Sequence, residues 1–163
     1  MILMAGVGLQ QVHAQNGGTA LGLRLTPDGG GFTGKFYANR NVAIEVQLNA
    51  GGVMGGNGES FTAVALAEYH IYMPDPSWQI FLGGGLHAGE WDHDGRNYRR
   101  GEYFYGDDDN EGIFGIDGIM GVQYKFRKIP LSLSADLKPA INFLSEPAFF
   151  PHNIFGVAAR FHL

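Results

Sequence analysis

The sequence contains no cysteine, so disulfide bonds, thiolate metal sites and cysteine nucleophiles are excluded, although this absence does not fix the compartment. It contains no run of about 18 consecutive apolar residues, which argues against a transmembrane helix. Charge is also scarce, since 17% of the residues are charged and the net charge is −5. This mild negative charge argues against nucleic acid as a partner.

Glycine and aromatic side chains are abundant, with 26 glycines and 13% aromatic residues. This composition favours a β-rich chain with tight turns over a helical bundle, and 163 residues suit one domain. An apolar run over residues 1–9 precedes the small-residue pattern Val12-His13-Ala14, which resembles a signal-peptide cleavage site. We interpret residues 1–14 as the remnant of a signal peptide without its positively charged region. A first strand or a tail is the alternative.

Apolar and polar residues alternate with a period of two, which predicts strands. In the segment VAIEVQLN, Val42, Ile44, Val46 and Leu48 share one face, while Glu45 shares the other with small and polar residues. The same pattern occurs in seven further segments. The eight predicted strands are 21–25, 32–37, 42–49, 60–72, 78–89, 113–126, 131–143 and 154–163.

The predicted connections alternate between short and long. The short ones are NRN (39–41), MPDPS (73–77) and RKIP (127–130), which carry Asn and Pro turn residues. The others are generally longer: 27–31, 51–60, 90–112 and 144–153. Short turns on one rim and longer loops on the other are typical of outer-membrane barrels, and an even strand count places both chain ends on the short-turn rim.

Charge is confined to one face of all the predicted strands. A lipid-facing Lys or Arg near the bilayer midplane would cost about 2–4 kcal/mol, so this exclusion indicates that the apolar face meets hydrocarbon. We predict an eight-stranded antiparallel up-and-down transmembrane β-barrel over residues 15–163 with a polar, filled lumen. The predicted lumenal network consists of Arg24, Lys35, Glu45, Glu68, His70, His87, Asp117, Lys125, Asp136, Lys138 and Arg160.

Paired charges are tolerable in such an interior, so we expect a salt-bridged plug rather than a diffusion pore. Gly83, Gly85 and Gly121 are expected to make room for long Lys and Arg side chains. Val64 and Leu66 fall on the polar parity of their strand, and only a β-bulge would return them to the apolar face. A soluble, lipocalin-like barrel that binds a ligand is the alternative, with the apolar face as its core.

Four stretches carry a family resemblance: GFTGKFYANRNVAIEVQLN, EYHIYMPDPSWQIFLGGGLHAGEW, GIDGIMGVQYKFRKIPLSLSADLKPAINF and GVAARFHL. They resemble the small eight-stranded outer-membrane β-barrels of Bacteroidota, OmpA-like or porin-like in the loose sense. The resemblance implies a location in the bacterial outer membrane and the lipid bilayer as a partner. No peptidoglycan-binding domain like that of full OmpA proteins follows Leu163, so that role is not carried over.

The chain end also resembles the signal that the barrel-assembly machinery reads, an alternating apolar pattern that ends in an aromatic residue. Val157, Ala159 and Phe161 fit this pattern, but the last residue is Leu163 rather than an aromatic one. From the residues that fit, the resemblance implies that the barrel-assembly machinery is a partner during insertion.

Three residue groups are candidates for reactive sites. Glu68, His70 and His87 share the lumenal parity, but no nucleophile or consistent ligand spacing accompanies them, so we interpret them as structural. Ser145, Glu146 and His152 resemble the residue types of lipid A-modifying barrels, but this composition is too common to indicate catalysis. The GGGL stretch lies within a predicted strand and is not a nucleotide site. We predict no enzyme activity, catalytic residue, metal or cofactor.

The longest connection, 90–112, combines carboxylates with aromatic residues and arginines. Its carboxylates suit a hard cation, but neither DHDGRN nor DDDNEG completes an EF-hand, so we expect a solvated loop. Aromatic residues beside arginine predict a recognition surface, formed by Tyr98, Arg99, Arg100, Tyr103 and Tyr105; alternatively, the loop caps the barrel mouth. The predicted function is structural or a surface interaction with an unnamed extracellular ligand or protein. Binding of a small or lipidic ligand by loops or lumen is the alternative.

Overall fold

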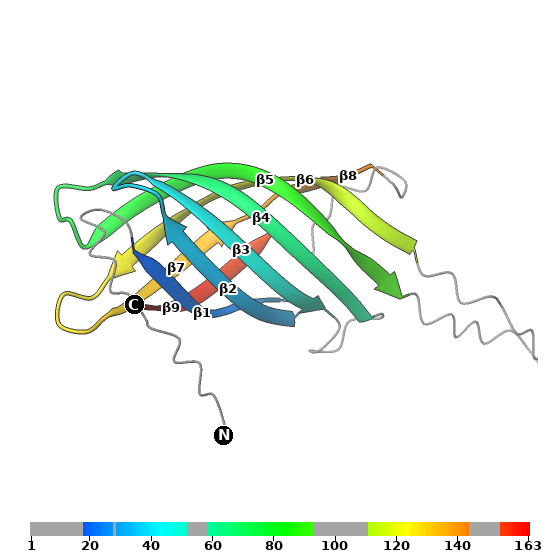
Figure 1. The fold of residues 1–163 in the computed structure, drawn as a ribbon, viewed down its shortest axis with the longest axis horizontal. Coiled ribbons are helices and arrows are strands. Elements are labelled where there is room, and N and C mark those ends of the chain that lie inside the picture. Colours follow the sequence, from blue (N-terminus) through cyan, green and yellow to red (C-terminus); the bar gives the residue numbers. More distant parts are fainter. Residues whose placement is uncertain (1–17, 28, 52–58, 93–110, 144–153) are drawn as a thin grey trace, which may run out of the picture.

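The computed structural model describes residues 18–27, 29–51, 59–92, 111–143 and 154–163. These residues form strands that wrap into a closed barrel, as Figure 1 shows. Within the described ranges, no helix is long and apolar enough to cross a membrane. The strands are β1 (Thr19–Thr26), β2 (Gly29–Tyr37), β3 (Val42–Gly51), β4 (Glu59–Tyr72), β5 (Trp78–Asp92), β6 (Glu111–Lys125), β7 (Leu131–Leu137), β8 (Ala140–Asn142) and β9 (Phe155–His162).

All neighbouring strands pair antiparallel, and the sheet closes because β1 pairs with β9 and β5 pairs with β6. β7 and β8 are two pieces of one crossing, since both pair with β6. Pro139 lies between them and has no backbone N–H to donate, which interrupts the ladder. Its carbonyl still accepts a hydrogen bond from the Gly118 N–H at 2.9 Å. The predicted eight-stranded antiparallel barrel is therefore confirmed.

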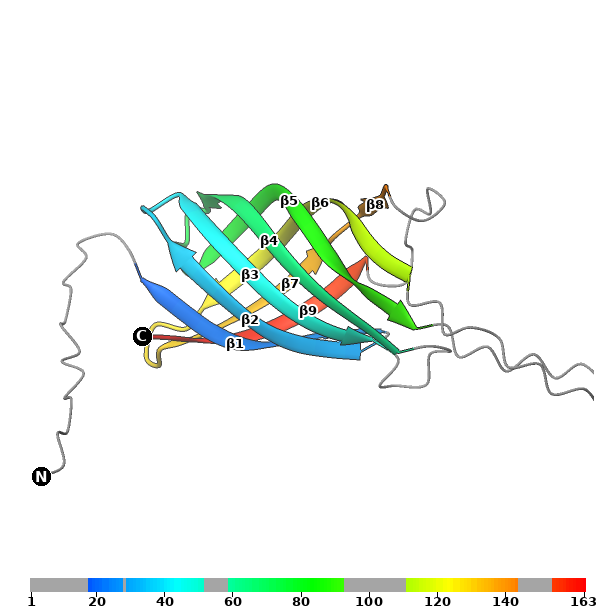
Figure 2. The same cartoon turned by 45° about the vertical axis from the view of Figure 1, so that its right-hand side comes forward.

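The short turns, the start of β1 and the end of β9 lie on one rim of the barrel (Figure 2). In the β2–β3 turn, the Asn39 side chain accepts hydrogen bonds from the backbone N–H groups of Asn41 and Val42, both at 2.9 Å. In the β4–β5 turn, the Asp75 carboxylate accepts the Ser77 N–H at 2.9 Å and forms an ion pair with Arg127. The Ser77 hydrogen bond first, and then Arg127, lowers the pKa of the Asp75 carboxyl. These turns are held by their own side chains.

The outward face of the barrel is apolar. Large hydrophobic side chains stand exposed along every crossing, as the 55% exposed Leu23 and the 70% exposed Phe32 illustrate. Glu90, near the end of β5, is an exposed carboxylate on the outward parity. It lies beyond the predicted end of that strand, so the rule that confines charge to one face holds for the barrel wall but not for this rim.

The inward face of β4 to β6 carries a small apolar cluster of Val64, Leu66, Phe81 and Ile119. The register of β4 with β3 and β5 is continuous, so no β-bulge returns Val64 and Leu66 to the apolar face. Both side chains point inward and are at least 98% buried. The lumen thus has one apolar wall, packed around Phe81, facing a polar one.

The inward glycines serve this packing differently from the prediction. A Cβ at Gly121 would overlap the Ala135 carbonyl oxygen and would lie 2.6 Å from Phe81 Cζ, so this glycine makes room for the β7 backbone and an aromatic ring rather than for a cation. At Gly83 and Gly85 a Cβ would meet the backbone of β4 instead of a Lys or Arg side chain. The glycine that accommodates a cation is Gly156, which lies directly against the Arg24 guanidinium.

Candidate functional site

The candidate site is the lumen, where the inward parity of the strands places the charged residues. At its centre the Lys35 ammonium lies 2.8 Å from a Glu45 carboxylate oxygen and 2.6 Å from one of Glu68. All three side chains are fully buried. Lys35 and Glu45 face each other because β2 and β3 pair them directly in register. The ammonium makes no well-directed hydrogen bond to a described residue, so its contribution here is a close ion pair with two carboxylates.

Glu45 is the most connected residue of the lumen. One of its oxygens accepts hydrogen bonds from Arg160 at 2.6 Å, Thr33 at 2.7 Å and Gln47 at 2.8 Å. Arg160 also donates to Thr33 at 3.2 Å and to Ser134 at 2.7 Å. A buried guanidinium needs several acceptors, and this one finds them on β2, β3 and β7 while it extends from β9. The contacts therefore tie opposite parts of the wall together.

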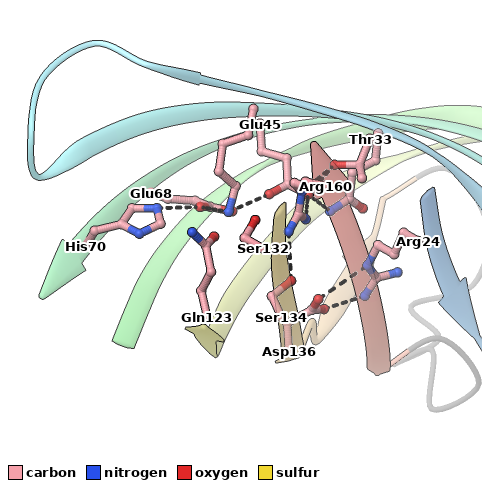
Figure 3. A network of polar contacts seen from close by, with 12 residues as sticks. Arg24, Thr33, Glu45, Glu68, His70, Gln123, Ser132, Ser134, Asp136 and Arg160 are labelled. Atoms are coloured by element: carbon pink, nitrogen blue, oxygen red, sulfur yellow. Dashed lines mark hydrogen bonds and ion pairs between the residues drawn. The ribbon is translucent and has the colours of Figure 1, made fainter. Parts of the chain in front are cut away.

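A second ion pair lies on the long-loop side of this centre. Arg24 on β1 donates to both oxygens of Asp136 on β7 in a two-point contact (Figure 3). Both side chains are at most 1% exposed. A planar guanidinium matches a carboxylate in this bidentate arrangement, which fixes orientation as well as charge.

A third group of contacts continues toward the long loops. Lys138 donates to Gln47 at 3.3 Å and lies 3.9 Å from Asp117. Asp117 in turn lies 2.8 Å from His87 Nδ1, while His87 Nε2 contacts the Asn142 side-chain oxygen. Both ring nitrogens of His87 are thus engaged, which leaves neither free to take a proton from a bound substrate.

Toward the short-turn rim the contacts involve histidine, glutamine and tyrosine. His70 Nε2 lies 3.0 Å from Glu68, and its Nδ1 lies 3.1 Å from Gln79. The Gln123 amide nitrogen donates to the Tyr37 hydroxyl at 3.1 Å, and the Tyr37 hydroxyl lies 3.4 Å from the Gln123 amide oxygen. Lys125 is only half-buried and holds its ammonium 4.4 Å from the Tyr37 ring centroid. Among the predicted lumenal residues, Lys125 alone forms no ion pair with another residue that the structure describes.

The charges of the lumen nearly balance, with Arg24, Lys35, Lys125, Lys138 and Arg160 facing Glu45, Glu68, Asp117 and Asp136. Some buried polar atoms make no hydrogen bond to described residues, among them Glu68 Oε1 and Asn142 Nδ2. No group of three or more His, Asp or Glu residues in the described ranges could hold a metal ion. This geometry supports pairing and filling of the lumen. A hydroxyl does lie beside an imidazole, since Ser132 Oγ is 2.9 Å from His162 Nε2 at the short-turn rim.

The sequence prediction named the charged members of the lumen but missed the neutral ones. These are Thr33, Gln47, Gln79, Gln123, Ser132, Ser134 and Asn142, all buried. Their strand parity, shared with the charged residues, was the signal that could have found them. The predicted recognition residues Tyr98, Arg99, Arg100, Tyr103 and Tyr105 lie outside the described residues, as do most of the loop carboxylates and Ser145, Glu146 and His152.

Comparison with known proteins gives a likeness in structure but not in sequence. No family model matches the chain, and no curated protein matches it. The chain is similar to the N-terminal β-barrel domain of Pseudomonas aeruginosa OprF, with a TM-score of 0.61 and 11% sequence identity. The match covers 91% of this chain and 98% of that one. At this identity the likeness shows a shared barrel fold.

Proposed function

We propose that this protein is a bacterial outer-membrane β-barrel with a structural or surface-interaction role and a closed, salt-bridged lumen. The observation that carries the proposal is the distribution of polarity across the barrel wall. Side chains such as Leu23, Val46 and Phe161 are exposed on the outside, whereas Lys35, Glu45 and Arg160 are buried inside. A soluble barrel needs the opposite arrangement. In water, the observed one would expose apolar side chains to the solvent and would keep the charged side chains away from it.

Aromatic side chains at the short-turn rim support insertion into a bilayer. Trp78 and Tyr124 contact each other with ring centroids 4.9 Å apart, and Tyr124 meets Phe126 edge-on at 5.0 Å. Tyr69 is 51% exposed near the same rim. Such amphipathic rings favour the boundary between hydrocarbon and headgroups. On β9, Val157 and Phe161 face outward, which suits recognition by the barrel-assembly machinery during insertion.

The contacts that cross the lumen support the proposal that it is closed. Arg160 links β9 to β2, β3 and β7, and Lys138 reaches from its wall to Gln47 on β3. An eight-stranded barrel has an interior just wide enough for side chains to fill. Hydrated ions would therefore have to break buried ion pairs in order to pass. We propose no pore, no enzyme activity and no cofactor, and the predicted origin from Bacteroidota remains a prediction.

Cell fractionation combined with gel mobility tests the proposal. The protein should be recovered in the outer-membrane fraction, and the folded form should migrate differently before and after boiling. Recovery in the soluble fraction without detergent would contradict membrane insertion. Planar-bilayer recording tests the closed lumen separately, because steady conductance from the purified, folded protein would be incompatible with a plugged barrel.

A further inference from the structure

Charge outside the lumen is distributed unevenly along the barrel axis. The short-turn rim carries the basic side chains of Arg40, Arg127 and Lys128 against a single acidic side chain, Asp75. Most acidic residues outside the lumen fall instead in the connections at the other end, above all in the segment between β5 and β6. A basic rim attracts anions over roughly a Debye length of about 8 Å at physiological ionic strength.

Two cations of this rim, Arg127 and Arg40, are held in place. Arg127 donates to the Ser77 hydroxyl at 2.8 Å and forms an ion pair with Asp75, although its side chain is still 67% exposed. The Arg40 guanidinium lies 5.0 Å from the Tyr72 ring centroid, and the Tyr72 hydroxyl donates to the Arg40 carbonyl at 2.9 Å. Neither Arg40 nor Lys128 forms an ion pair with a described residue. Preorganised side chains lose less conformational entropy when they bind an anion.

The same rim is continuous with the outward aromatic side chains. Arg127 and Lys128 directly follow Phe126 in the chain, and Phe126 packs against Tyr124, which packs against Trp78. Ser77, the hydrogen-bond partner of Arg127, immediately precedes Trp78. A ligand with a negative headgroup and an apolar tail would therefore meet cations and aromatic rings together.

We propose that the short-turn rim binds anionic phospholipids, with Arg127, Lys128 and Arg40 contacting the headgroup phosphates and the adjacent aromatic rings contacting the upper acyl chains. This inference rests on the proposed membrane insertion and adds a lipid preference to it. Each basic residue near a bilayer surface strengthens the attraction about fivefold. The membrane leaflet at the short-turn side is the source of the ligand.

Trp78 provides the reporter, because the sequence has only two tryptophans. A Trp91→Phe background leaves Trp78 alone beside the rim. The full chain is folded into vesicles that contain phosphatidylcholine with brominated acyl chains, or phosphatidylglycerol brominated in the same way. Brominated phosphatidylglycerol should quench Trp78 as if it were enriched more than fivefold at the protein, and added sodium chloride should reduce this enrichment.

Three variants locate the effect. Lys128→Gln should lower the enrichment several-fold while it leaves the tie between Arg127, Ser77 and Asp75 intact, and adding Arg127→Gln should bring it close to one. Pro27→Glu, in the connection between β1 and β2 at the other rim, lowers the net charge by the same amount and should change nothing. If Pro27→Glu weakens the preference as much as Lys128→Gln, then net charge explains the result and the proposal is wrong.

The experiment also separates this inference from the proposed function. A protein that inserts and shows the gel shift, but is quenched equally by both lipids, retains the barrel assignment and refutes the lipid preference. A protein that fails to insert into either vesicle refutes the proposed function itself. Inorganic phosphate, compared with chloride at equal ionic strength, should not abolish the preference. Loss of the preference in phosphate would point to a simple anion site and overturn the lipid assignment.

Discussion

Replacement of Glu45 by Gln probes the lumen at its most connected point. The substitution keeps the size of the side chain and removes its charge. Lys35 then keeps only Glu68 as a carboxylate partner, and Arg160 keeps only neutral acceptors such as the hydroxyls of Thr33 and Ser134. Of these two fully buried cations, Lys35 would keep one carboxylate partner and Arg160 would keep none.

The expected cost follows from this burial. Breaking a buried ion pair by removing one partner costs about 3–5 kcal/mol, because the remaining charge stays desolvated. An exposed pair contributes only about 0–1 kcal/mol. The difference between these ranges makes the experiment a test of whether the lumen is dry and closely packed. We therefore expect Glu45→Gln to lower the free energy of unfolding by about 3–5 kcal/mol.

Urea unfolding of the protein in phospholipid vesicles, followed by tryptophan fluorescence and by gel mobility, measures this change. Glu90→Gln makes the same chemical change at an exposed position near the end of β5, and it should stay within about 0.5 kcal/mol of the parent protein. Arg160→Gln should cost as much as Glu45→Gln, and the double variant should cost less than the sum because the two side chains contact each other.

A Glu45→Gln effect below about 1 kcal/mol, similar to that of Glu90→Gln, would refute the reasoning. It would mean that water reaches the ion pairs and screens them, as in an open channel. Strictly additive effects of Glu45→Gln and Arg160→Gln would equally contradict the close contact between these side chains.

Three further predictions concern the wall and the rim. Leu23→Arg places a cation on the outward face and should cost about 2–4 kcal/mol in vesicles if Leu23 lies near the midplane, measured by the same urea titration. Gly121→Ala should cost about 1–3 kcal/mol because its Cβ would overlap Phe81, whereas Gly118→Ala, whose nearest contact is Pro139 at 3.5 Å, should be tolerated. By NMR, the Asp75 carboxyl should titrate below 3.8, so its stabilising contacts are present above that pH and lost as the pH falls, and Arg127→Gln should raise its pKa.

The alternation of apolar and polar residues within the strands was enough to predict most of the fold. In β3, Ile44 and Val46 alternate with Glu45 and Gln47, and this period of two assigns a face to every residue before any contact is known. The barrel closure followed from the number of crossings and from the alternation of short and long connections. The split of the seventh crossing at Pro139 was not predicted, although the missing N–H of proline was visible in the sequence.

The lumen was harder to predict because its partners are distant in sequence. Parity places Arg24 and Asp136 on the same side of the wall, but only the order and tilt of the strands bring them together. The apolar cluster around Phe81 was missed for another reason. Val64 and Leu66 break the binary pattern, and an exception of this kind reads as a bulge until packing against Phe81 explains it.

A spin-label scan on β3 tests most directly whether the apolar face meets acyl chains. The absence of native cysteines allows single-cysteine variants at Ile44, Val46 and Leu48, with Arg40→Cys in the short turn as the aqueous reference. In vesicles, labels at the three outward positions should collide often with dissolved oxygen and rarely with a water-soluble nickel complex. If the nickel complex reaches Ile44, Val46 and Leu48 as readily as it reaches position 40, the outward face is in water and the account is wrong.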